Sequence, residues 1–169
     1  FGENYELPNE SAYAETCASI ANFMWNYRML LVSGESRFAD IMELCLYNGI
    51  LSGISIDGKE YFYVNPLADR GSHRRQRWFA CACCPPNIAR TITSIPGYMY
   101  SVSSEGIWVH LYASNVSEFS INGSKIVIEE RTDYPWNGLV EFKISGNARF
   151  KLFLRKPGWN KEFSLSING

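Results

Sequence analysis

The sequence contains no apolar run approaching the roughly 20 residues that a membrane-spanning helix needs. It also lacks a basic face: the formal net charge is −1, and the only basic cluster is the short stretch 73–77. A protein that binds nucleic acid requires such a face, so we expect neither a membrane nor a nucleic-acid partner. There are 2 histidines, one in a basic loop and one in a strand pattern. These settings are typical of surface or core residues, and neither histidine is assigned a role.

The sequence also lacks an initiating methionine, and residues 1–9 read as a loop entered midway. Its last residues, 164–169, stop within a strand-and-turn pattern. We therefore expect the chain to be a piece of a longer protein. Its 169 residues, 46% of them apolar, suffice for one domain or somewhat more with a real core.

Helical spacing dominates the first hundred residues. Apolar side chains recur at this spacing from Ile20 to Leu31, after a possible N-cap at Thr16. A second helix is predicted over residues 38–46, ending near Gly49. A third is predicted from the two prolines at 85–86 to residue 96, because proline fits the first turn of a helix.

Strand signals begin between the second and third helices and dominate after residue 100. Asp57-Gly58 separates two alternating runs and predicts a hairpin turn, and a polar loop follows over residues 69–77. Short alternating segments lie at 106–112, 119–128, 139–144 and 150–154, with Asn122-Gly123 as a turn. Such a series predicts an antiparallel β-sandwich. The fold class is therefore α+β, with helices in residues 1–100 and the sandwich in residues 101–169.

The 5 cysteines are an odd number, which argues against a disulfide framework. Cys45 lies on the apolar stripe of the second helix, where core packing is its ordinary role. Cys81 has no obvious partner. The remaining three are Cys17, Cys83 and Cys84.

These three cysteines and Glu15 form a reasonable tetrahedral zinc set. Glu15 and Cys17 point to the same side if they precede or open a helix. Cys83 and Cys84 stand just before a helix start, where a thiol loses its proton more easily. The spacing is not that of a zinc finger, and buried, inert cysteines remain the favoured interpretation from spacing alone.

Two motifs carry a resemblance to a known family. Residues 13–19 read Tyr-Ala-Glu-Thr-Cys-Ala-Ser, and residues 83–87 read Cys-Cys-Pro-Pro-Asn. Together with the stretches 7–9, 41–44, 47–49 and 61–67, they resemble glycoside hydrolase family 127, whose characterised members include β-L-arabinofuranosidases. The similarity covers most of the first hundred residues in order.

This resemblance implies a specific architecture and chemistry. It implies the last helices of an (α/α)6 barrel followed by the β-sandwich. It implies a zinc ion, Zn2+, held by Glu15, Cys17, Cys83 and Cys84, with Cys83 as the nucleophile of a retaining furanosidase. The expected substrate is a terminal β-L-arabinofuranose on a plant-derived glycan or other small carbohydrate. Glu43 and Tyr63 match positions that contribute to the substrate pocket in relatives.

In the family, the general acid is a glutamate upstream of the position that matches residue 1. We therefore expect the whole protein to be active and residues 1–169 alone to be inactive. Three alternatives stay open: a structural zinc module, a member of the family that acts on another furanoside, and a non-catalytic carbohydrate-binding protein that uses aromatics such as Trp108, Trp136 and Trp159. Unpaired thiols suit a reducing compartment, so we expect a cytoplasmic location, with the periplasm as the alternative. The sequence does not indicate an oligomeric state.

Overall fold

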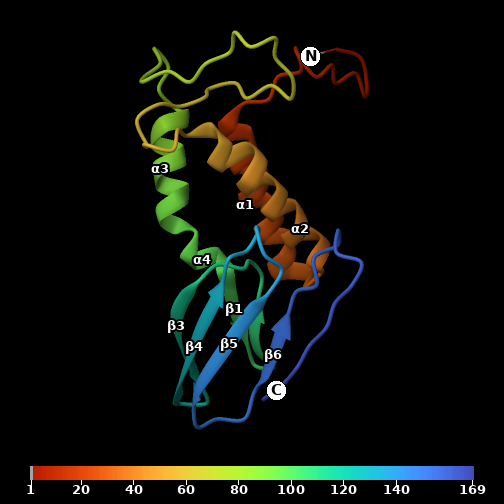
Figure 1. Cartoon of the computed structure of the whole chain (residues 1–169), viewed down its shortest axis with the longest axis vertical. Helices are drawn as coiled ribbons and strands as arrows, with labels where there is room; N and C mark the ends of the chain where they lie inside the picture. The colour runs from red at the N-terminus through yellow and green to blue at the C-terminus, as the bar shows by residue number, and fades with distance from the viewer. Residues whose placement is uncertain (1) are drawn as a thin grey trace. The chain divides into compact units, whose positions relative to one another are not determined.

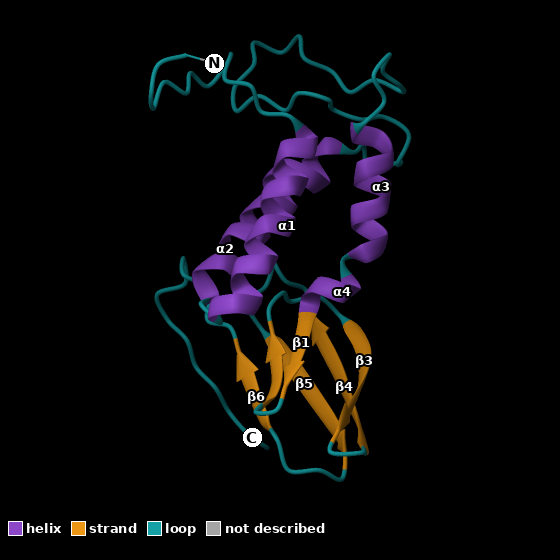
Figure 2. Cartoon of the chain, turned by 180° about the vertical axis from the view of Figure 1, so that it is seen from behind, coloured by secondary structure: helices purple, strands orange, loops and turns teal. Residues whose placement is uncertain are grey.

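The computed structural model describes residues 2–169. The chain divides into two compact units, Phe1–Ile95 and Pro96–Gly169. Figure 2 shows the long helices in the first unit, and the strands with one short helix in the second. The predicted order of helices followed by sheets is confirmed. Within the described residues, no helix is long and apolar enough to cross a membrane.

Three helical segments form the first unit. They are α1 (Thr16–Ser33), α2 (Ser36–Cys45) and α3 (Cys84–Ser94), and α2 continues through a π-turn, η1 (Leu46–Ile50), and a 3-10 turn, η2 (Leu51–Gly53). Helices α1 and α2 lie side by side (Figure 1). Gly34 ends α1 in the left-handed conformation, with φ +69°, and its N–H donates to Leu30 O at 2.8 Å.

Two helix boundaries differ from the sequence-based expectation. Glu15, not Thr16, is the N-cap of α1. The Thr16 hydroxyl donates to Phe62 O at 2.9 Å, so a contact distant in sequence occupies the group that was expected to cap the helix. The second helix also continues past Gly49. A Cβ at residue 49 would lie 2.3 Å from Ser19 Oγ, so Gly49 permits close packing against α1 rather than ending the helix.

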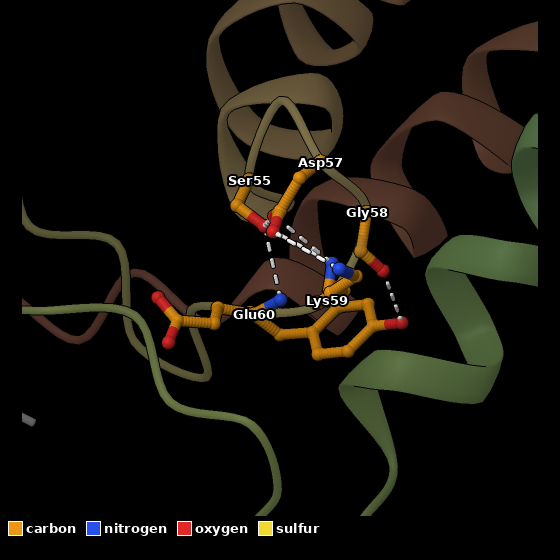
Figure 3. Close-up of polar contacts among 6 residues, drawn as sticks. Ser55, Asp57, Gly58, Lys59 and Glu60 are labelled. Carbon is orange, nitrogen blue, oxygen red and sulfur yellow. Dashed lines mark hydrogen bonds and ion pairs between the residues drawn. The ribbon is translucent and has the colours of Figure 1, made fainter.

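The Asp57-Gly58 turn is confirmed, but long strands do not flank it. Ser55 Oγ accepts the N–H groups of Lys59 and Glu60 at 3.1 and 2.9 Å (Figure 3). Gly58 has φ +73°, which favours glycine. Only isolated bridges surround this turn, because residues 61–65 also bond to other segments: Phe62 N–H donates to Gly53 O at 2.9 Å.

The second unit contains the short helix α4 (Pro96–Met99) and two three-stranded sheets. The first sheet has the order β1 (Tyr100–Ser103), β2 (Gly106–Val109), β6 (Lys151–Leu154), and the second has the order β3 (Asn115–Ile121), β4 (Ser124–Thr132), β5 (Val140–Gly146). Asn122 and Gly123 join β3 to β4 with φ of 50° and 78°, which confirms the predicted turn.

One strand pair corrects the expectation of an entirely antiparallel arrangement. β2 pairs with β6 in parallel, in the register Gly106↔Lys151. Parallel neighbours require a long crossover connection, and the intervening residues, which include the whole β3-β4-β5 sheet, provide it. The alternating pattern of a short strand does not specify the direction of a partner so distant in sequence.

Buried polar groups lie between and beside the two sheets. Glu130 on β4 is 1% exposed. It accepts hydrogen bonds from the Tyr100 hydroxyl on β1, from Asn115 Nδ2 at 3.1 Å and from Ala113 N–H at 3.1 Å. Burial raises the pKa of the Glu130 carboxyl, and these donors oppose the increase. The Tyr100 ring also meets the Phe119 ring of β3 edge-on at 5.3 Å, so Tyr100 links the two sheets.

His110 is the second buried titratable group of this unit. Its Nε2 lies 2.8 Å from Ser101 Oγ, and Arg155 Nε donates to its backbone oxygen at 2.6 Å. Burial, and then the positive charge of Arg155, lower the pKa of the imidazole from 6.5 to about 4. The folded protein therefore holds this histidine neutral at a pH where an unfolded chain would protonate it.

We expect the stability of this unit to fall as the pH decreases from 6.5 to 4. In that window the unfolded state binds a proton at His110 that the folded state does not bind, so the stabilisation is complete above pH 6.5 and lost towards pH 4. Between pH 7 and pH 4, the free energy of unfolding measured in urea should decrease by up to about 3 kcal/mol more in the wild type than in His110→Gln. The variant keeps Glu130, so the opposite titration of that carboxyl cancels in the comparison. Identical pH profiles would show that His110 does not carry the effect.

Candidate metal centre

Four candidate ligand atoms converge in the helical unit. One oxygen of Glu15 and the sulfurs of Cys17, Cys83 and Cys84 all lie within 4.8 Å of one another. The Cys83 and Cys84 sulfurs are 3.7 Å apart. Glu15 Oε1 lies 3.4 Å from the Cys83 sulfur and 3.8 Å from the Cys84 sulfur.

The starts of two helices place these groups. Glu15 is the N-cap of α1 in an extended conformation, with φ −72° and ψ 136°, and Cys17 lies in the first turn. Cys83 is the N-cap of α3, and Cys84 is its first residue. Both helices begin at the same end of their unit, as Figure 1 shows. Backbone pairing of Glu15 with Val64 fixes the connecting loop beside them.

The distances among Glu15, Cys83 and Cys84 fit a tetrahedral metal ion, and the Cys17 sulfur lies within 4.8 Å of all three. Two sulfurs about 2.3 Å from a shared zinc lie about 3.8 Å apart at the tetrahedral angle, and a sulfur and an oxygen lie about 3.6 Å apart. The observed separations are 3.7 Å for sulfur to sulfur and 3.4 and 3.8 Å for sulfur to oxygen. The cluster is therefore able to hold a metal ion, and three sulfurs with one carboxylate are a donor set suited to zinc.

Without a cation, Cys84 and Cys17 favour the protonated thiol. Burial raises the pKa of Cys84 well above its usual range, and its contact with Cys17 raises it further. Burial also raises the pKa of Cys17, although a hydrogen bond from Asn87 opposes this increase. A bound divalent cation reverses the preference, because it attracts the thiolate and displaces the proton.

The other predicted residues divide into two groups. The Tyr63 hydroxyl lies 3.9 Å from the Cys81 sulfur, and its hydrogen bonds with Cys83 and Cys81 raise its pKa. Tyr63 is thus beside the cluster. Glu43 is a buried residue of α2, 6% exposed, and does not belong to the four-residue cluster. All 5 cysteines of the sequence are free thiols.

Two contacts to the cluster were not predicted. The Tyr13 hydroxyl donates to Glu15 Oε2 at 2.8 Å, and this hydrogen bond raises the tyrosine pKa. Asn87 Nδ2 donates to the Cys17 sulfur at 3.2 Å. Sequence spacing could have indicated both contacts. Tyr13 precedes Glu15 by two residues in an extended segment, and Asn87 follows Cys83 by one helical turn, so each side chain points to the same side as a residue of the cluster.

Known proteins resemble the chain along its whole length. Residues 1–97 match the catalytic domain of β-L-arabinofuranosidases of glycoside hydrolase family 127 (GH127), and residues 106–169 match the middle domain of the same family. A non-reducing end β-L-arabinofuranosidase of Bifidobacterium longum is 40% identical over 100% of this chain, which spans 28% of that protein.

Solved structures give the same result. A GH127 β-arabinofuranosidase superimposes with a TM-score of 0.90 and 51% identity, covering 94% of this chain and 25% of the other. A GH127 β-L-arabinofuranosidase of Geobacillus stearothermophilus T6 gives a TM-score of 0.88 and 44% identity, covering 96% of this chain and 28% of the other. The chain thus spans about a quarter of the length of these relatives. It belongs to glycoside hydrolase family 127, the β-L-arabinofuranosidase family.

Proposed function

We propose that the protein containing this chain is a retaining glycoside hydrolase that releases β-L-arabinofuranose from the non-reducing end of a plant-derived glycan. The observation that carries the proposal is the convergence of Glu15, Cys17, Cys83 and Cys84 within 4.8 Å. It occurs in a segment that matches the family's catalytic domain. The Bifidobacterium relative bears the name of this activity.

In this proposal, residues 1–100 supply the last helices of an (α/α)6 barrel and residues 101–169 an incomplete β-sandwich. Exposed apolar side chains on the helices favour the assignment of this unit to part of a larger barrel. Trp25 and Val32 on α1 are 66% and 84% exposed, and Leu44 on α2 is 63% exposed. Apolar groups of this size on adjacent helices are normally covered by other parts of a protein, and the remaining barrel helices would cover them.

Cys83 acts as the nucleophile, with Glu15, Cys17 and Cys84 as the other ligands of the zinc ion. A zinc ion held there would supply the charge that favours the thiolate form of its cysteine ligands. The Cys83 sulfur forms a bond to the anomeric carbon while the bond from that carbon to the leaving oxygen breaks. The leaving oxygen takes a proton from a general acid that we place outside residues 1–169. Water then attacks the anomeric carbon, displaces the Cys83 sulfur and gives its proton to the same group, so two inversions yield retention.

Two further residues contribute to the substrate pocket in this proposal. The Tyr63 hydroxyl lies 3.9 Å from the Cys81 sulfur and the Tyr63 backbone oxygen lies 3.8 Å from the Cys84 sulfur, so Tyr63 borders the cluster that contains the nucleophile. Glu43 supplies a carboxylate from α2, where it accepts sugar hydroxyl groups. We place the protein in the cytoplasm, where a reducing environment preserves free thiols.

The full-length protein should hydrolyse an aryl β-L-arabinofuranoside and release β-configured sugar as the first product. The α-L-arabinofuranoside places its leaving group on the opposite face from the acid, so its kcat/KM should be lower by at least about 1,000-fold. Residues 1–169 alone should show no turnover. First-formed α-sugar, observed by NMR during the reaction, would rule out retention, and equal rates on both anomers would rule out the assigned substrate.

A structural zinc site is the second candidate function. One observation favours it: the cluster already provides four protein ligands, the number that closes a structural site. A structural ion would remain bound while catalysis used other residues. The two functions differ in the reactivity of Cys83, since a nucleophile should be alkylated by iodoacetamide faster than Cys17 or Cys84 and substrate should protect it.

A further inference from the structure

Asn87 occupies the first turns of α3 and contacts the cluster from outside. Its Nδ2 donates to the Cys17 sulfur at 3.2 Å, and its Oδ1 accepts a hydrogen bond from Arg90 Nη2 at 2.5 Å. Arg90 lies three residues further along α3. The side chains therefore form a chain of contacts that runs from Arg90 through Asn87 to Cys17 on α1.

This arrangement determines which end of the amide faces the sulfur. A guanidinium group donates hydrogen bonds and accepts none. The amide oxygen of Asn87 must therefore face Arg90, which leaves the NH2 group directed at Cys17. A sulfur that is a metal ligand carries negative charge and accepts a hydrogen bond more strongly than a neutral thiol.

The net negative charge of the ligands explains why a hydrogen-bond donor next to Cys17 would stabilise the site. Three thiolates and one carboxylate carry two more negative charges than a divalent cation neutralises. A donor aimed at one sulfur offsets part of that excess and holds the ligand in place. The Tyr13 hydroxyl likewise donates a hydrogen bond to the Glu15 carboxylate, at 2.8 Å, and offsets part of its negative charge. Such outer contacts commonly change metal affinity by roughly 10- to 100-fold when removed.

We infer that Asn87, oriented by Arg90, is a positioning residue that stabilises Cys17 as a metal-bound thiolate. The inference rests on the proposed zinc site. Asn87 does not touch the reacting sugar; it acts through Cys17. The backbone contacts of Asn87 are independent of its side chain, because its N–H donates to Cys83 O at 3.2 Å and its carbonyl accepts Thr91 Oγ1 at 2.8 Å. Replacing the amide therefore leaves the start of α3 intact.

The test compares two amides that each donate to a cysteine sulfur. Asn87→Leu removes the donor to Cys17. Asn22→Leu is the matched control, because Asn22 Nδ2 donates at 3.4 Å to Cys45, which lies outside the cluster. In the full-length protein, chelator competition should show zinc affinity lower by roughly 10- to 100-fold in Asn87→Leu and unchanged in Asn22→Leu.

Substitution with cobalt(II) provides an absorption band whose wavelength would not change through a general loss of stability. A hydrogen bond lowers the energy of the sulfur lone pairs, so its loss should shift the sulfur-to-cobalt charge-transfer band to longer wavelength in Asn87→Leu. Arg90→Leu, a change at an exposed position, should give a smaller shift and an affinity loss of less than about 10-fold. Asn87→Gln, which keeps an amide, should recover part of the affinity.

The outcomes separate this inference from the proposed function. A wild-type protein that binds neither zinc nor cobalt would overturn the metal site itself. A protein that binds both metals, with the same affinity and the same band in wild type and Asn87→Leu, would overturn the role of Asn87 and leave the hydrolase proposal standing. Equal losses in Asn87→Leu and Asn22→Leu would also overturn it, since a specific contact with Cys17 predicts a difference.

Discussion

Replacing Cys83 with alanine in the full-length protein should lower kcat for an aryl β-L-arabinofuranoside by at least about 1,000-fold. The variant has no sulfur to attack the anomeric carbon, and alanine offers no alternative nucleophile. KM should change little, because the side chains that contact the sugar remain. Steady-state kinetics, with zinc content measured on the same samples, checks the prediction.

The matched control is Cys45→Ala. Cys45 is also a partly buried thiol of the helical unit, but its sulfur accepts from Asn22 and is not a member of the cluster. Its replacement should leave kcat within about 3-fold of the wild type. If Cys83→Ala retained near wild-type turnover with zinc bound, the nucleophile assignment would be wrong and the structural role would gain support.

The double variant Cys17→Ala/Cys84→Ala should reduce bound zinc from about one ion per chain to less than about 0.1. The substitutions remove one ligand at the start of α1 and one at the start of α3, and leave only Glu15 and Cys83. Turnover should also fall by more than about 100-fold although Cys83 is retained, because no metal ion then holds the Cys83 sulfur in place. Plasma mass spectrometry of the purified protein measures the metal.

A second double variant, Cys45→Ala/Cys81→Ala, removes the same number of thiols from outside the cluster and should keep its zinc. It therefore distinguishes ligand loss from a general effect of cysteine removal. The thermal unfolding midpoint should fall in the first double variant and not in the second, because a metal that binds only the folded state stabilises it. Stoichiometric zinc in both variants would exclude Cys17 and Cys84 as ligands.

Local patterns in the sequence were sufficient for much of the fold. Apolar spacing predicted α1, α2 and α3, since helix periodicity depends on residues three and four apart. The Asp57-Gly58 and Asn122-Gly123 turns follow from the tolerance of these residues for positive φ, and both are present. The two motifs around Glu15 and Cys83 also predicted the family, which the comparisons confirm.

Other features depend on contacts that no local pattern encodes. The parallel pairing of β2 with β6 follows from how distant segments meet. The Thr16 hydroxyl bonds to Phe62 rather than capping its own helix. In each case, a partner more than 40 residues away competes with the local preference.

The candidate metal centre shows the same division. The sequence by itself determined the residue types, two pairs of ligands each beside a helix start. Only the tertiary structure decided that the pairs share one site, because the separation of Cys17 from Cys83 depends on how α1 packs beside α3. The same packing brings Asn87 to the Cys17 sulfur. Sequence spacing sets the direction of a side chain within its own helix, whereas the distance between two helices is set by all the side chains that pack between them.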